Sequence, residues 1–269
     1  MTLLATNGRL RECATAVDAL PIEPTLRVAC LGTFRIAGLG AWDDGPPARR
    51  ARELLLYLVL HPKNTAPRER LIELLWPDLG GDGVAHRLHL AASAVRTSVR
   101  AVLGGFDALR CSGAGYAWHP SLRIVSDVAT FSALYHGGSV QACKDAVALY
   151  TGELLCGEQG DWLQPLRVKY AAMHASMLER LADGAVEQRN FEEALHYGLE
   201  LLASDRAHEG ASRLVMRCFA ALGRRSQAAN EYEALRAYVH KHLGVEPMPE
   251  TQVLIRTILG EERAPQRLK

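Results

Sequence analysis

The chain has 269 residues, enough for about two domains at roughly 150 residues per domain. Its 48% apolar and 23% charged residues are typical of a globular protein and exclude a chain that is disordered throughout. The net charge of +1 means that a nucleic-acid site would need local clustering of basic residues. No apolar run approaches the roughly 18 residues of a membrane span.

Basic residues are concentrated in the middle of the chain. Residues 26–127 hold 13 Lys and Arg against 9 Asp and Glu, whereas residues 1–25 and 128–269 have net charges of −1 and −2. This excess favours a polyanionic partner for the middle segment. Six scattered cysteines form no CxxC pair, and charged residues interrupt the first twenty positions. We therefore expect reduced thiols, no secretory core and a cytoplasmic location.

Residues 26–127 carry the pattern of a small mixed domain. Short apolar runs at 26–30 and 34–36 predict strands, and three helices are expected over 48–61, 67–75 and 83–103. Pro62 ends the first helix, and Gly104 and Gly105 end the third. The runs 109–118 and 122–125, on either side of residues 119–121, predict a hairpin. Strands, three helices and a terminal hairpin describe a winged helix-turn-helix.

The rest of the chain is predicted to be helical. Helices are expected over 139–151, 162–189, 191–203, 207–222, 225–243 and 249–259. Ala194 and Ala228 are 34 positions apart, as are Leu201 and Leu235, and this is the tetratricopeptide period. The predicted fold is mainly α with a small β part: a winged helix-turn-helix domain at 26–127, then a tetratricopeptide-like helical repeat domain at 128–260. Residues 1–25 are an N-terminal extension and 261–269 a C-terminal tail.

The third predicted helix has the composition of a DNA-reading helix. Residues 83–106 contain no acidic side chain. At about 100° per residue, the apolar positions share one face and Arg87 and Arg96 flank it. The opposite face collects six residues: His86, His89, Leu90, Ser93, Thr97 and Arg100. Small polar residues permit close approach to the major groove, arginines suit guanine edges or phosphates, and Leu90 suits a thymine methyl.

An ordinary amphipathic surface helix with solvated cations explains this helix alone about equally well. The neighbouring helices favour the DNA interpretation, because their starts also carry arginines. Arg49, Arg50 and Arg52 begin the first helix, and Arg68 and Arg70 begin the second. Free N–H groups at helix starts favour phosphate. We therefore expect phosphate contacts at Arg49, Arg50, Arg52 and Arg68.

Two stretches of the chain resemble known families. Residues 26–127 resemble the OmpR-type winged-helix domain through LGTFRI, ARRARELLLYLVLHP, RERLIELLWPD, HRLHLAASAVRTSVR, GAGYAW and VSDVATF. Residues 128–260 resemble the bacterial transcriptional activator domain through LYTGELL, DWLQPLR, RNFEEAL, LVMRCFAALGRRSQA and LGVEPMPET. In this order, the pair resembles the activators called Streptomyces antibiotic regulatory proteins. The match spans roughly residues 26–260.

This resemblance implies sequence-specific binding to double-stranded promoter DNA, a homodimer on direct repeats, and contact with RNA polymerase. It implies base readout by the third helix, where Arg96 and Arg100 match basic positions, and backbone contact by the wing, where Tyr116 matches the wing tyrosine. The N-terminal 25 residues have no counterpart in the pattern.

Motifs for enzymatic chemistry are not found. The sequence has no GxxxxGK[ST], GxGxxG or HExxH, so we expect no enzyme, cofactor or metal site. His86 and His89 could ligate a metal at helical spacing, but a role facing DNA or solvent is favoured. The alternative function is a helical-repeat scaffold that does not itself select promoters. A small-molecule effector of the helical domain is left open.

Overall fold

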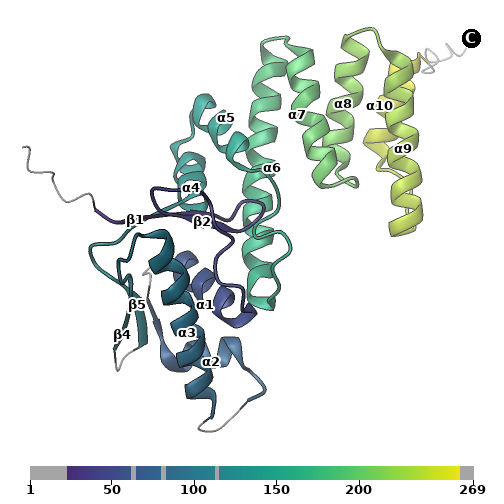
Figure 1. The fold of residues 1–269 in the computed structure, drawn as a ribbon. Coiled ribbons are helices and arrows are strands. Elements are labelled where there is room, and N and C mark those ends of the chain that lie inside the picture. Colours follow the sequence, from purple (N-terminus) through teal and green to yellow (C-terminus); the bar gives the residue numbers. More distant parts are fainter. Residues whose placement is uncertain (1–22, 62–64, 80–82, 113–114, 261–269) are drawn as a thin grey trace, which may run out of the picture. The chain divides into compact units, whose positions relative to one another are not determined.

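The protein is described by a computed structural model that covers residues 23–61, 65–79, 83–112 and 115–260 (Figure 1). The chain divides into two compact units. Of the described residues, the winged-helix unit contains 23–28 and those within Ile36–Val125. The helical unit contains Ala29–Arg35 and 126–260. Residues 1–22 of the expected extension, and the expected tail 261–269, lie outside the described residues.

The winged-helix unit contains two three-stranded sheets and three helices. The first sheet has the order β2 (Arg35–Ala37), β1 (Thr25–Ala29), β6 (Arg123–Ser126). The second has the order β3 (Thr65–Pro67), β5 (Gly115–Trp118), β4 (Leu109–Ser112). The helices are α1 (Arg49–Leu60), α2 (Arg68–Leu75) and α3 (Gly83–Val102). All three expected helices therefore form, within two residues of the expected bounds.

The apolar faces of the three helices form the core of this unit. Leu54 and Leu58 of α1, Leu71 of α2 and Leu88 of α3 are fully buried. The Trp118 side chain of β5 joins them, and its indole N–H donates to the Leu58 carbonyl oxygen at 3.3 Å. This bond satisfies the one polar atom of a large buried ring and fixes the hairpin against α1.

The hairpin of this unit differs from the expected one. Residues 109–118 form two strands rather than one, because β4 pairs with β5 antiparallel, with Cys111 opposite Tyr116. The last strand, β6, pairs with β1 in the other sheet. Gly115 has φ +139°, and a Cβ there would meet the Ala66 carbonyl of β3. Glycine is required at this close approach. Gly113 and Gly115 are turn signals in the sequence, and the expectation of a single strand did not take them into account.

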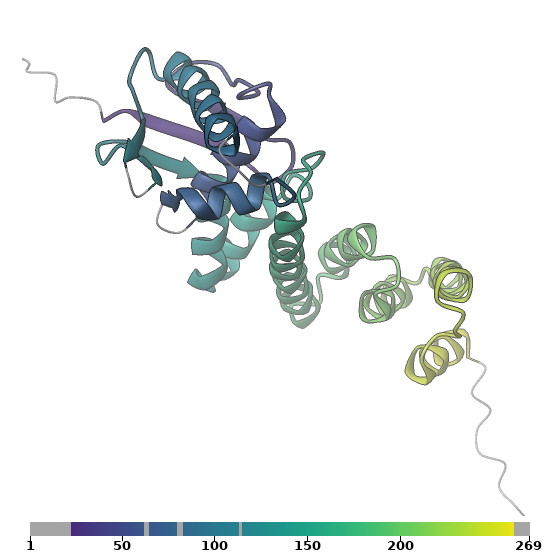
Figure 2. The same ribbon diagram turned by 90° about the horizontal axis from the view of Figure 1, so that it is seen from below.

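The helical unit is a succession of helices, of which α6 to α10 stack side by side in Figures 1 and 2. The helices are α4 (Asp127–Gly137), α5 (Val140–Leu149), α6 (Gln164–Glu187), α7 (Phe191–Ser204), α8 (Glu209–Ala221), α9 (Arg225–Leu243) and α10 (Pro249–Leu259). Six of them lie where the periodicity predicts. Helix α4 is not among the expected helices, although Val128, Phe131 and Tyr135 have helical spacing.

The 34-residue repeat corresponds to equivalent positions on α7 and α9. Ala194 and Ala228 are both fully buried, and Leu201 and Leu235 are at most 2% exposed. Gly198 of α7 lies so close to α8 that a Cβ there would be 2.8 Å from the Val215 side chain. Small residues thus let paired helices approach, as a stacked repeat requires. The predicted fold, mainly α with a winged helix followed by helical repeats, is confirmed.

A segment from early in the chain completes the helical unit. Leu31 forms an antiparallel bridge with Leu154, and Leu155 N–H donates to the Cys30 carbonyl at 2.7 Å. Gly32 has φ +112°, and a Cβ there would lie 2.7 Å from the Thr151 hydroxyl. This interleaving of distant segments is not part of the linear ranges expected from the sequence. Across the described ranges, no helix is long and apolar enough to cross a membrane.

Candidate nucleic-acid interface

Helix α3 separates its residues into a buried face and an exposed face, as the helical wheel predicts. The buried face consists of Val84, Leu88, Ala91, Ala92, Val95 and Val99. The exposed residues include His86, His89, Leu90, Ser93, Thr97 and Arg100. Leu90 is 55% exposed although it is a large apolar residue. We call these six residues the α3 face.

Much of the hydrogen-bonding capacity of this region is unused within the described part of the chain. His86, Arg87 and His89 are exposed and have no hydrogen-bond or ion-pair partner there. The Arg100 Nε donates to the Gly105 carbonyl at 3.0 Å, which holds the guanidinium in place while its terminal nitrogens remain available. The Thr97 hydroxyl donates to the Ser93 carbonyl and keeps its acceptor lone pairs.

Arg96 has a different environment from the α3 face. Its Nε donates to Asp107 Oδ1 and its Nη2 to the Leu109 carbonyl, both at 3.1 Å. The side chain is 31% exposed. Arg96 therefore ties α3 to the start of β4, and its charge is largely matched by Asp107. The resemblance implies a role for Arg96 in reading DNA, but the chain after α3 folds back beside this side chain and binds it.

The arginines at the start of α1 are also engaged. Arg49 and Arg50 both bind the Glu53 carboxylate, at 2.9 and 2.6 Å, and the Glu53 side chain is only 4% exposed. The Arg52 Nε donates to the Pro46 carbonyl at 3.2 Å. Three arginines and one glutamate leave two net positive charges at this helix start. The i,i+3 and i,i+4 spacing of these residues was a sequence signal for the pairing.

Arg68 and Tyr116 complete the set of expected contact residues. Arg68 is exposed at the start of α2 and has no ion-pair partner in the described ranges. Tyr116 is 5% exposed within β5. Burial raises the pKa of its phenol, as does the neighbouring Cys111 thiol, while the positive charge of Arg68 opposes this increase. Tyr116 therefore belongs to the sheet rather than to the exposed surface. Residues 113–114, at the wing tip, lie outside the described residues.

The structure thus brings together seven of the expected residues on α3, namely the α3 face and Arg87. It does not bring Arg96 and Tyr116 to that surface. Over the described residues, no group of three His, Cys, Asp or Glu side chains is placed to hold a metal ion. The surface offers exposed donors, acceptors and one apolar side chain without any acidic residue, which is suited to an anionic, hydrogen-bonding partner.

Comparisons with known proteins agree with this architecture. The regulatory protein AfsR of Streptomyces coelicolor is 28% identical over 254 residues, covering 89% of this chain. The chain spans about a quarter of the length of that relative. In fold, the chain is similar to Mycobacterium tuberculosis EmbR, solved in complex with a low affinity phosphopeptide. That match has a TM-score of 0.70 and 17% identity, and covers 90% of this chain and 67% of the other.

The family comparison identifies the second half of the chain. The Bacterial transcriptional activator domain matches residues 127–259, which include α4 to α10. The expected resemblance to the Streptomyces antibiotic regulatory proteins is confirmed by this match together with the AfsR relative. The curated relative is named a regulatory protein. Residues 127–259 of this chain therefore belong to the bacterial transcriptional activator domain family.

Proposed function

We propose that the chain is a sequence-specific DNA-binding transcription activator that reads promoter DNA with α3. The observation that carries this proposal is the α3 face, which is exposed, polar and free of acidic residues. A helix in the major groove requires such a face, because base edges present hydrogen-bond donors, acceptors and thymine methyl groups. The regulatory relative and the winged-helix architecture support the same function.

The residues of α3 have distinct proposed roles. Arg100 reads a guanine edge through its free terminal nitrogens, since its Nε is already held by Gly105. Bases or sugars are contacted by His86, His89, Ser93 and Thr97. Leu90 contacts a thymine methyl. Arg87, at the border of the buried face, contacts the phosphate backbone.

Phosphate contacts outside α3 are proposed to centre on Arg68. Its guanidinium is unpaired in the described ranges and lies at a helix start, where free N–H groups add to its attraction for phosphate. Arg49, Arg50 and Arg52 contribute less per residue, because a buried glutamate and a backbone carbonyl already bind them. Arg96 and Tyr116 support the hairpin, and their effect on DNA is indirect.

The helical unit is proposed to hold the protein partners. A stacked repeat offers extended surfaces for binding other proteins, and the matched domain family is one of transcriptional activators. RNA polymerase and a second protomer on direct promoter repeats are the proposed partners. We propose that residues 26–127 form the DNA-binding domain and residues 128–260 the activator domain. The segment Ala29–Arg35 lies within the first range but packs as part of the activator domain.

The test starts from a pool of random duplexes incubated with the full chain. We expect repeated selection to enrich one motif, and binding to the enriched duplex to fall steeply as salt rises, because phosphate contacts release counterions. The scaffold alternative predicts no retained duplex and no motif. A pool that stays random after several rounds, with a folded protein, would overturn the proposal.

A further inference from the structure

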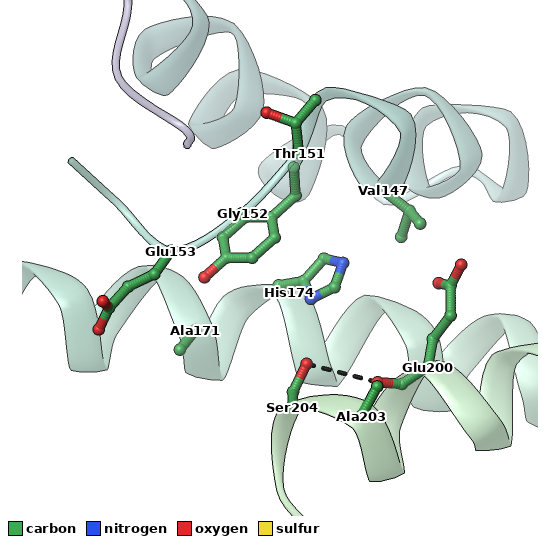
Figure 3. A pocket seen from close by; sticks show the side chains of 10 residues that line it. Val147, Thr151, Gly152, Glu153, Ala171, His174, Glu200, Ala203 and Ser204 are labelled. Atoms are coloured by element: carbon green, nitrogen blue, oxygen red, sulfur yellow. Dashed lines mark hydrogen bonds between the residues drawn. The ribbon is translucent and has the colours of Figure 1, made fainter. Parts of the chain in front are cut away.

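The helical unit contains a cavity outside the candidate DNA interface. Its volume is about 480 Å³, and it is lined by Val147, Tyr150, Thr151, Gly152, Glu153, Ala171, His174, Glu200, Ala203 and Ser204. These residues come from α5, the loop after it, α6 and α7 (Figure 3). A volume of this size is typical of small-molecule sites, which span roughly 300–1,000 Å³.

His174 is the central feature of this cavity. Its side chain points from α6 into the space (Figure 3) and stacks on the Tyr150 ring, with centroids 4.1 Å apart and an interplanar angle of 13°. The residue is 8% exposed, yet its ring nitrogens have no hydrogen-bond partner in the described chain. Burial lowers the pKa of the imidazole to about 4, so it is neutral at pH 7. Its ring nitrogens are therefore available to a ligand that enters the cavity.

Apart from the Tyr150 phenol, which can also donate, the other polar side chains of the cavity offer acceptors. The Thr151 hydroxyl donates to the Leu31 carbonyl and the Ser204 hydroxyl to the Glu200 carbonyl, which leaves only their lone pairs for a ligand. The Glu153 and Glu200 side chains add two carboxylates. No lysine or arginine is among the described residues that line the space.

Arg167 and His196 lie beside the two carboxylates, and Arg167 supplies one fixed positive charge against two negative charges. The Arg167 Nε is 3.9 Å from Glu153 Oε2, and this guanidinium also donates to the carbonyls of Leu154, Leu155 and Glu158. His196 Nε2 is 3.4 Å from Glu200 Oε1, and the His196 side chain is 66% exposed. At neutral pH, the cavity therefore combines negative charge with a flat aromatic stack.

We propose that this cavity binds a small organic cation with a flat, donor-rich head, of the amidine, guanidine or aromatic amine class. The head stacks beside the Tyr150–His174 pair, donates to the two carboxylates and hydroxyl oxygens, and uses the unpaired imidazole as a further partner. Phosphates, nucleotides and carboxylates are disfavoured, because two carboxylates and no lysine or arginine line the space. The cavity residues belong to the helical unit and α3 belongs to the winged-helix unit, so the inference does not depend on whether α3 binds DNA.

The first test compares three probes of nearly the same shape and different charge. Benzamidine is a cation, benzamide is neutral and benzoate is an anion. Calorimetric titration of the full chain at pH 7.5, without DNA, is expected to show benzamidine binding about tenfold more tightly than benzamide, with no benzoate binding. Equal binding of the three probes, or no benzamidine binding, would overturn the proposal.

Paired variants locate the binding. Ala171 lines the cavity and Ala172 does not, and both are exposed on α6. Ala171→Trp is expected to abolish benzamidine binding by filling the space, whereas Ala172→Trp leaves it unchanged.

A second pair of variants tests the carboxylate. Glu200→Gln is expected to weaken benzamidine binding about five- to tenfold. Glu187 is an exposed α6 residue away from the cavity, and Glu187→Gln is expected to leave the binding unchanged. Benzamidine binding that survives both Ala171→Trp and Glu200→Gln would place it elsewhere and contradict the inference.

Discussion

The carboxylate of Asp127 binds the backbone of Cys30, which lies 97 positions earlier in the chain. The Cys30 N–H lies 2.9 Å from Oδ1 and 2.8 Å from Oδ2, and the Leu31 N–H donates to Oδ2 at 2.8 Å. The same carboxylate accepts from Val128 N–H at the start of α4. One side chain thus begins the helical unit and fastens the Ala29–Arg35 segment to it.

Replacing Asp127 by Ala is expected to lower the free energy of unfolding of the helical unit by about 2–4 kcal/mol. The change leaves the N–H groups of Cys30 and Leu31 without an acceptor, and an unsatisfied buried donor costs roughly 1–3 kcal/mol. Denaturant unfolding followed by circular dichroism measures the effect. Asp183→Ala, at an exposed α6 position, is the matched control. Equal stability of the two variants would mean that Asp127 does not hold the segment.

Replacing Arg96 by Ala is expected to destabilise the winged-helix unit by about 1–3 kcal/mol. The variant removes the donors to Asp107 and to the Leu109 carbonyl, and hydrogen bonds of charged groups contribute about 1.5–3 kcal/mol before solvent screening. Arg87→Ala, on the same helix but exposed and unpaired in the described ranges, should leave the unfolding midpoint unchanged. If Arg96→Ala were as stable as Arg87→Ala, Arg96 would have no structural role.

The sequence predicts those features of this protein that depend on local pattern. The bounds of α9 and α10 match the expected 225–243 and 249–259, because glycines follow both helices and Pro249 begins the second. The division of α3 into two faces also follows from periodicity alone. The sequence does not predict α4, because this helix is short and has only two buried residues, Val128 and Phe131.

Features that depend on distant parts of the chain could not be predicted in this way. The pairing of β6 with β1, rather than with the adjacent β5, is decided by tertiary packing. A helical wheel gives the angle of Arg96 but does not place Asp107 and Leu109 beside it. The cavity around His174 likewise joins segments 50 positions apart, and no local motif marks it.

Replacing Ala228 by Leu is expected to cost about 1–3 kcal/mol by overpacking. Ala228 is fully buried on α9 among Met216 and Ile255, where the 34-residue repeat requires a small residue. Ala237, exposed on the same helix, provides the control, and Ala237→Leu should be neutral. Thermal unfolding of both variants decides the matter. If the Ala228→Leu variant unfolded at the same temperature as the parent protein, close helix stacking at this position would be contradicted.

Acidification is expected to destabilise the protein in part through His174. Its native pKa is about 4, lowered by burial from an ordinary value of 6.5. Between these values the unfolded chain binds a proton that the native state does not, so the free energy of unfolding falls as the pH falls from 6.5 to 4. The loss assigned to this group is up to about 3 kcal/mol.

The His174→Phe variant isolates this effect, because phenylalanine keeps a ring against Tyr150 and does not titrate. Urea unfolding at several pH values is expected to give a stability difference between parent and variant that shifts in favour of the variant below pH 6.5. Parallel pH profiles would show that His174 binds its proton equally in the native and unfolded states.

The most direct test of the DNA-reading role is the affinity of Arg100→Ala for a selected duplex and for a scrambled duplex, at several salt concentrations. Removing a base-reading arginine should cost about 1–3 kcal/mol on the selected duplex and much less on the scrambled one. Arg68→Ala is the comparison, and should weaken both duplexes alike and reduce the salt slope by about one unit. If Arg100→Ala weakened both duplexes equally, α3 would serve as an anchor, and the assignment of sequence readout to its exposed face would be contradicted.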